Sequence, residues 1–273
     1  MSGESSPHKR QKYTVSFFNH DAVVSSHDEV AQPEHLEGET RGAISELSFK
    51  SRQRLAFTAV NSEVVFRSML TCTVHPDAGI KSGVTFKNSM KPLLQLLRDR
   101  GNEYLWFLEF QKNGSPHIHI LLSRYPDEEA VKGANGKPWF KESSFDLSSK
   151  WAKYVAKAID LDSEVDLFDP RFEAIKKMAS ASCRFEPITS KDGGARYACK
   201  YAYKTEQKSV PFQFNDVGRF WGCTRGVRPK RKEVIAATWE QLEEAGFTFF
   251  DYHDGERSFG GPMKVQFGKS HTN

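Results

Sequence analysis

The stretch that decides the fold is EFQKNGSPHIHILL, residues 109–122. It joins two apolar, β-rich segments, EYLWFLEFQ at 103–111 and HIHILL at 117–122, through the turn-forming residues 112–115. An Asn-Gly pair between two apolar runs is a strong signal for a tight β-hairpin. The stretch therefore predicts two neighbouring antiparallel strands.

The flanking sequence adds helices and further strands on both sides of this hairpin. Ser48 is placed to cap a helix, because a serine hydroxyl accepts a hydrogen bond from the first helical turn. Periodicity predicts helices over 51–62, 90–100, 148–159, 193–204 and 232–245, and strands over 64–73 and 184–188. This order predicts an α+β fold with a central antiparallel sheet and flanking helices, which we expect on one face of the sheet.

The length of 273 residues predicts one main domain with extensions. Residues 1–42 lack sustained periodicity and predict a mobile leader. Residues 43–210 are the expected main domain, and 211–273 an extension with a basic segment and a helix, packed on that domain. Residues 1–50 carry a net charge of −3 and the remainder +7, from 34 basic and 27 acidic residues. A basic body fits a nucleic-acid partner.

Cysteine spacing and hydropathy exclude several classes of protein. The four cysteines are far apart and form no CxxC pair, which argues against a zinc ribbon and a disulfide framework. No apolar run approaches the roughly 18 residues of a membrane span, and the first 20 residues lack the apolar core of a secretory signal. We therefore expect a cytoplasmic protein without a membrane partner.

A candidate metal site lies on the hairpin. Residues i and i+2 of a strand face the same side, so His117 and His119 point together while Ile118 and Ile120 pack on the other face. Glu109 on the preceding strand is placed to reach the same side. Two imidazoles and a carboxylate leave coordination positions open and suit Mg²⁺ or Mn²⁺ acting on a phosphodiester. The alternative is a solvated strand face without a ligand.

A candidate nucleophile lies in YACKYAYK, residues 197–204, which contains YxxK twice. Tyr197 and Tyr201 are four residues apart and share one helix face, with Lys200 and Lys204 in a parallel row. A phenol with a pKa of about 10 is a weak nucleophile at neutral pH, and a nearby ammonium or bound cation favours the phenolate. The alternative is an amphipathic helix with aromatic packing and solvated lysines.

A basic and aromatic segment follows the second tyrosine pair. Such segments stack bases and neutralise phosphates, although the aromatic residues can equally be core and the charges a solvated edge. The candidate DNA-binding residues of this segment are Arg219, Trp221, Arg225, Arg228, Lys230, Arg231 and Lys232.

Together these motifs resemble the HUH endonuclease superfamily, specifically the replication initiators of rolling-circle plasmids and single-stranded DNA phages. PHIHILL matches the His-hydrophobe-His motif, and Glu109 stands where the family commonly has its third ligand. YACKYAYK matches the motif with the tyrosine nucleophile, in the form with two tyrosines. MLTCTVHP, residues 69–76, resembles the first motif but has Cys72 and Val74 where FLTLTxP is usual; we expect its Thr71 and Thr73 to contact DNA.

The resemblance implies an RRM-like fold and an initiator that nicks single-stranded or hairpin origin DNA in a bacterial or phage-infected cell. It implies a divalent metal, a 5′-phosphotyrosine intermediate, a 3′-OH primer, and a host polymerase and helicase as partners. Single-strand transposases and mobilisation relaxases use the same chemistry, but typical relaxases have a third histidine and an N-terminal tyrosine. A non-catalytic RRM-like binding module is the alternative outside enzymes.

Overall fold

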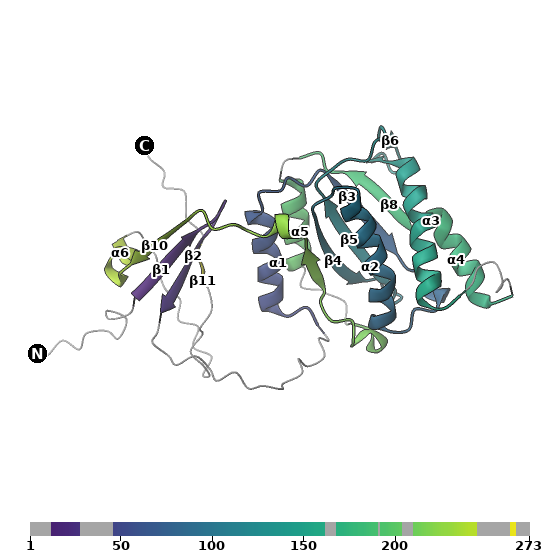
Figure 1. Ribbon diagram of the computed structural model, residues 1–273, viewed down its shortest axis with the longest axis horizontal. Coiled ribbons are helices and arrows are strands. Elements are labelled where there is room, and N and C mark those ends of the chain that lie inside the picture. The colour runs from purple at the N-terminus through teal and green to yellow at the C-terminus, as the bar shows by residue number, and fades with distance from the viewer. Residues whose placement is uncertain are drawn as a thin grey trace, which may run out of the picture. The chain divides into compact units, whose positions relative to one another are not determined.

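The computed structural model describes residues 12–27, 46–161, 168–190, 192–203, 210–244 and 263–265. The chain divides into two units (Figure 1). The larger comprises Arg41–Arg228, and the smaller comprises Met1–Thr40 together with Pro229–Asn273. Each unit is described by itself.

The larger unit is built on a five-stranded antiparallel sheet with the order β8-β3-β5-β4-β9. Its strands are β3 (Ser68–Thr73), β4 (Tyr104–Phe110), β5 (Pro116–Leu122), β8 (Cys183–Pro187) and β9 (Trp221–Cys223). The predicted hairpin is confirmed: β4 pairs with β5, and Gly114 in the turn has a φ of 82°, which a side chain would disfavour. The strand that carries both histidines is therefore central.

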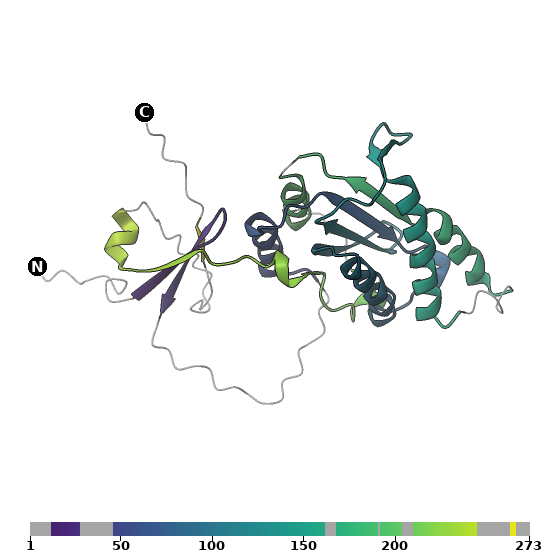
Figure 2. The same ribbon diagram turned by 45° about the horizontal axis from the view of Figure 1, so that its top comes forward.

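Helices cover both faces of this sheet (Figures 1 and 2). One face packs against α2 (Gly83–Asp99), α3 (Lys141–Ala158) and α4 (Pro170–Ala181). The other packs against α1 (Phe49–Asn61) and α5 (Gly193–Tyr203). The α+β class with flanking helices is confirmed, but the expectation that the helices lie on one face is wrong. The reason is visible in β4, where six of seven side chains are buried, so both of its faces require cover.

The local helix signals are partly confirmed. The Ser48 side chain accepts a hydrogen bond from Ser51 N, as expected of the α1 cap. The second helix begins well before the predicted residue 90, because Ser82 caps it through Thr85 N. The shorter elements of this unit are β6 (Val131–Lys132), β7 (Pro138–Trp139), η2 (Pro76–Ala78), η3 (Phe212–Phe214) and η4 (Arg225–Val227).

The smaller unit is a four-stranded antiparallel sheet with the order β10-β1-β2-β11. Its elements are β1 (Lys12–Phe17), β2 (Ala22–His27), β10 (Glu233–Ala237), α6 (Trp239–Glu244) and β11 (Met263–Val265). Regular structure thus occurs within the segment expected to be a mobile leader. The helix predicted over 232–245 is wrong in its first half, because the β-branched Val234 and Ile235 pair with β1 instead.

All four cysteines are free thiols, and Cys72 faces Cys183 across β3 and β8 in the buried core. Among the described residues, no helix combines the length and the apolar character needed to cross a membrane.

Candidate active site

Strand β5 presents His117 and His119 on the sheet face that α1 and α5 cover. Ile118 and Ile120 alternate with them and are fully buried in the opposite face. The two imidazole centroids are 4.5 Å apart, and His119 is only 3% exposed. The period-two alternation therefore brings the two rings side by side, as the sequence predicts.

Glu109 of β4 stands directly opposite His117 in the β4–β5 register. Its Oε2 lies 3.5 Å from Nε2 of His119, and its side chain is 16% exposed. The structure thus brings together the three residues expected to bind a metal. Within the described residues, no three His, Cys, Asp or Glu side chains form a ready-made ion site, so these three would have to turn towards a common point to enclose a cation.

The donor set itself fits a divalent ion of the Mg²⁺ or Mn²⁺ type. Two imidazole nitrogens and a carboxylate oxygen form a mixed N/O set that leaves positions for water or phosphate oxygen. A Glu109 side chain has three rotatable bonds and a solvent-accessible part, so its carboxylate can adjust to an ion.

Two threonines of β3 hold the outer nitrogens of these histidines. Thr71 Oγ1 lies 3.0 Å from His119 Nδ1, and Thr73 Oγ1 lies 2.8 Å from His117 Nδ1. Each threonine is the direct cross-strand partner of its histidine. Engagement of Nδ1 fixes the ring orientation and leaves Nε2 as the coordinating nitrogen, an arrangement common around bound metals. The hydroxyls that we expected to contact DNA are therefore directed at the histidines.

Helix α5 brings both tyrosines to the same place. The Tyr201 ring centroid is 4.8 Å from that of His119, and the Tyr197 centroid is 5.7 Å from it. The two phenol oxygens are 3.2 Å apart. Phe107, two residues before Glu109 on β4, supports Tyr201 with a centroid distance of 4.8 Å. The motifs of the sequence did not point to Phe107, although strand periodicity places it on this face.

Burial and hydrogen bonding strongly raise the pKa of Tyr201. Desolvation is the largest cause, followed by the hydrogen bond and charge interaction with Tyr197, and then by Glu109. The negative charge and hydrogen bond of Glu109 both favour the protonated phenol. Tyr201 is thus held as a neutral phenol, and a cation beside Glu109 would offset the carboxylate charge and ease ionisation.

This raised pKa predicts a loss of stability at high pH. The folded chain holds the Tyr201 proton more tightly than the unfolded chain does, so the stabilisation is complete below about pH 10 and is lost as the pH rises through the raised value. We expect Tyr201→Phe to reduce the fall in unfolding free energy above about pH 10, measured by urea titration across that range. Tyr125→Phe, which removes an exposed hydroxyl, is the control; equal slopes for both variants would contradict the assignment.

The family follows from a comparison with known proteins. Residues 67–206 match the family model described as replication-associated protein ORF2. The chain belongs to this family of replication-associated proteins. The matched segment contains β3, β4, β5 and α5, which carry every residue of the site described above. Comparisons with curated proteins and with solved structures gave no significant match.

The lysines of this replication-associated protein are less closely placed than its tyrosines. Lys200 is exposed on α5, and in the part of the chain that the structure describes it makes no hydrogen bond or ion pair. Lys204 lies outside the described residues. The lysine row therefore remains a prediction from the sequence.

The basic segment is divided between the two units. Arg225 and Arg228 are exposed in the larger unit, and Arg228 counteracts the effect of burial, which raises the pKa of the Cys223 thiol. The exposed residues Lys230, Arg231 and Lys232 belong to the smaller unit.

Two further residues of the segment take part in packing. The Lys87 ammonium donates to the backbone carbonyl of Arg219, with 2.6 Å between the atoms. The Trp221 indole donates to Ser51 Oγ of α1 at 3.0 Å, and its ring packs against the buried core. The core interpretation of Trp221 therefore gains support over a role in base stacking.

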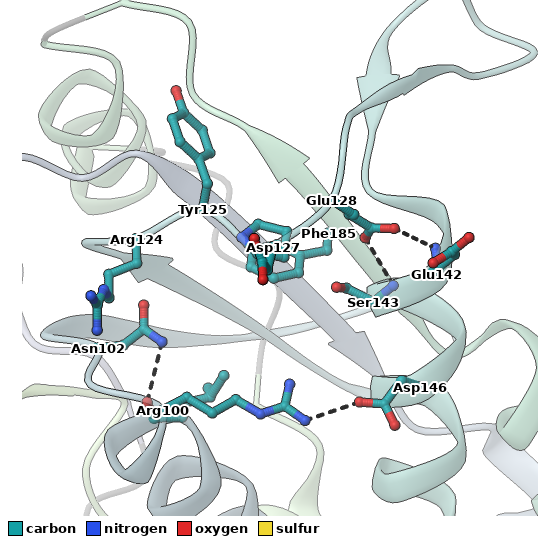
Figure 3. Close-up of a pocket in the computed structure, with 12 residues that line it drawn as sticks. Arg100, Asn102, Arg124, Tyr125, Asp127, Glu128, Glu142, Ser143, Asp146 and Phe185 are labelled. Atoms are coloured by element: carbon teal, nitrogen blue, oxygen red, sulfur yellow. Dashed lines mark hydrogen bonds and ion pairs between the residues drawn. The ribbon is translucent and has the colours of Figure 1, made fainter.

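A cavity of ≈ 610 Å³ lies away from these residues (Figure 3). It is lined by Asn102, which precedes β4, and by Arg124, which follows β5. His117 stands at the other end of β5, so roughly 16 Å of strand separates the two regions. The charged residues that line the cavity are Arg100, Arg124, Asp127, Glu128, Glu142 and Asp146. Because carboxylates outnumber guanidinium groups, this cavity does not suit a phosphodiester.

Proposed function

We propose that this replication-associated protein is a metal-dependent endonuclease that nicks single-stranded or hairpin origin DNA through a tyrosine. The observation that carries the proposal is the meeting of two phenols with a histidine and carboxylate group. Tyr201 packs 4.8 Å from His119, whose Nε2 faces Glu109. A nucleophile next to metal-ligand side chains is the constellation that phosphodiester transfer to a protein requires.

Glu109, His117 and His119 would hold the cation, Mg²⁺ or Mn²⁺. When bound, it supplies Lewis-acid polarisation of the phosphodiester and offsets the developing negative charge. Thr71 and Thr73 keep the imidazole rings in a fixed orientation through Nδ1. The Glu109 carboxylate interacts with both His119 and Tyr201, so it links the ligand group to the nucleophile.

The phenol oxygen of Tyr197 or Tyr201 attacks the phosphorus and loses its proton to water. An O–P bond to tyrosine forms as the bond from phosphorus to the 3′ oxygen breaks, and the 3′ oxygen takes up a proton from water. The products are a 5′-phosphotyrosine and a free 3′-OH. Lys200 and Lys204 assist by their positive charge. Because the ester to tyrosine conserves the energy of the broken bond, the reverse reaction rejoins strands.

The free 3′-OH primes a host polymerase, with a host helicase separating the strands, in rolling-circle replication. The contact between the Tyr197 and Tyr201 hydroxyls favours a scheme with two tyrosines, because either phenol can approach one phosphate. Transposases and relaxases use the same chemistry, and membership of a replication-associated family favours replication. A non-catalytic RRM-like module would present exposed aromatics on this face, whereas Phe107 is 2% exposed.

The test is the metal-dependent formation of a covalent adduct. Purified protein is incubated with Mn²⁺ and end-labelled single-stranded oligonucleotides that tile the replicon encoding the chain. We expect one oligonucleotide to yield a protein–DNA adduct stable to denaturant and a shortened product with a 3′-OH. EDTA should prevent both products. If no oligonucleotide gives an adduct with Mn²⁺ or Mg²⁺, the proposed function is wrong.

The threonines provide a second prediction. We expect Thr71→Val and Thr73→Val each to weaken Mn²⁺ binding about tenfold, because valine keeps the shape of threonine and removes only the bond to Nδ1. Isothermal titration with Mn²⁺ measures the effect without DNA. Thr85→Val removes a hydroxyl that bonds to Ser82 on the opposite face and serves as control. Unchanged Mn²⁺ affinity in both β3 variants would show that the threonines do not position the histidines.

A further inference from the structure

The residues on the active-site face form a row that continues beyond the histidines to the edge of the sheet. Thr71 of β3 stands opposite His119 on one side and opposite Arg184 of β8 on the other. Because directly opposed residues in an antiparallel sheet share a face, Arg184 lies on the same face as His119.

Trp139 extends this row by one more strand. The Phe140 backbone N–H donates to the Phe185 carbonyl at 2.8 Å, so the end of β7 runs alongside β8. Phe140 and Phe185 are buried in the core of the opposite face and contact each other there. Since neighbours in an extended chain alternate, Trp139 and Arg184 are directed to the active-site face. The Arg184 guanidinium lies 5.1 Å from the centroid of the Trp139 ring.

The guanidinium of Arg184 keeps hydrogen-bonding capacity. Its Nε donates to Glu186 Oε1 at 2.7 Å, and the side chain is 37% exposed. Within the described residues, its Nη2 has no hydrogen-bond partner. An arginine has five N–H donors in a planar fork that suits phosphate, so one carboxylate does not satisfy it.

Aromatic surface and positive charge surround this arginine. Trp139 contacts Phe145 of α3 with a centroid distance of 6.0 Å, and Phe145 is 45% exposed. Residues 130–141, which contain the β6–β7 hairpin, include three lysines and no acidic residue. These lysines, Lys132, Lys137 and Lys141, are all exposed. Aromatic rings beside cations are the surface on which proteins stack single-stranded bases.

We propose that Trp139, Phe145 and Arg184, here called the β8-edge platform, bind single-stranded DNA next to the scissile phosphate. A base stacks on the aromatic surface and Arg184 contacts a backbone phosphate. Arg184 is two strands from β5, or about 10 Å, which is within about three nucleotides of the reacting phosphorus at a stacked spacing of about 3.4 Å. This location rests on the proposed function, which places the scissile phosphate at His119. Stacking on an open ring requires unpaired bases, so the ligand is single-stranded DNA and not duplex.

Fluorescence anisotropy with a fluorescein-labelled single-stranded oligonucleotide of mixed sequence, in EDTA, tests the platform without any nicking. We expect Trp139→Ala and Arg184→Ala each to weaken binding about tenfold. Arg184→Ala should also reduce the slope of log affinity against log salt by about 0.7, the value for one phosphate contact on a single strand. Trp139→Ala should leave that slope unchanged. Arg184→Lys should restore the slope with only part of the affinity, because it keeps the charge and loses the planar stack.

Two controls match these changes on the other side of the sheet. Arg100→Ala removes an arginine that is ion-paired to Asp146 and 42% exposed, and Phe168→Ala removes a fully exposed aromatic ring. Both should bind the oligonucleotide as the unmodified chain does. Arg184→Lys tests the platform even if Trp139→Ala fails to fold.

The platform is refuted if Arg184→Lys and a folded Trp139 variant bind with unchanged affinity and salt slope. It is also refuted if the unmodified chain does not bind the oligonucleotide. The outcome is separable from nicking. Adduct formation with unaffected binding in the variants would refute only the platform, whereas platform-dependent binding without any adduct would refute only the nuclease.

Discussion

A Tyr197→Phe/Tyr201→Phe double variant is expected to form no covalent adduct and to nick origin DNA at least about 10³-fold more slowly than the unmodified chain. Phenylalanine keeps the ring contacts with His119 and Phe107, so the fold and the metal ligands are preserved. The variant lacks both phenol oxygens, which are the only nucleophiles in the proposed mechanism. Denaturing gels with the end-labelled oligonucleotide measure the adduct and the cut product in one experiment.

The single variants divide this effect between the tyrosines. Tyr201 is the more deeply engaged phenol, since burial, Tyr197 and Glu109 all raise its pKa. If both tyrosines react, each single variant should retain adduct formation on the other, and peptide mapping should find the DNA on the remaining phenol. Tyr125→Phe, on the rim of the distant cavity, controls for loss of a tyrosine hydroxyl. An adduct in the double variant would mean that another residue is the nucleophile.

The centre of the site could be predicted because it depends on short-range geometry. The Asn113-Gly114 turn fixes the β4–β5 register, and period-two alternation then places Glu109, His117 and Phe107 on one face. Helical spacing likewise places Tyr197 and Tyr201 one turn apart on α5. Each of these relations joins residues that are close in the sequence.

The remainder depends on pairing between distant segments, which no local pattern reports. The register of β3 against β5 decides that Thr71 meets His119, 48 residues away, and the same strand aligns Arg184 from β8. A shift by one residue would have turned the threonines to the opposite face. The first motif therefore signalled importance in the sequence, but its hydroxyls contact histidine where we expected DNA.

The smaller unit shows the same limit more strongly. Tyr13 of β1 pairs with Ala237 of β10, on the far side of the whole larger unit in sequence. The short segment 232–245 has apolar residues compatible with either a helix or a strand, and the distant partner decides the outcome. Composition alone marked residues 1–42 as a leader because strands need their partners before their alternation acquires meaning.

The second large effect is expected at His119. We expect His119→Phe to weaken Mn²⁺ binding about 100-fold or more, and nicking about 10³-fold, since Lewis-acid catalysis contributes several kcal/mol. Phenylalanine fills the buried position and preserves the contacts with Phe107 and Tyr201, but it has no nitrogen to coordinate a cation. Isothermal titration measures the binding and the oligonucleotide assay measures the rate. His20→Phe, an exposed histidine in the smaller unit, is the control.

Glu109→Gln separates the two tasks that the site performs. The amide is a weaker ligand, so Mn²⁺ affinity and nicking should fall as they do for His119→Phe. The same change removes a negative charge that raises the pKa of Tyr201, so the phenol of the metal-free variant should ionise at lower pH than in the unmodified chain. Ultraviolet difference spectra record phenolate directly. Opposite signs for metal affinity and phenol ionisation are specific to a carboxylate shared by the cation and the nucleophile; a variant with unchanged Mn²⁺ binding and an unchanged phenol titration would place both elsewhere.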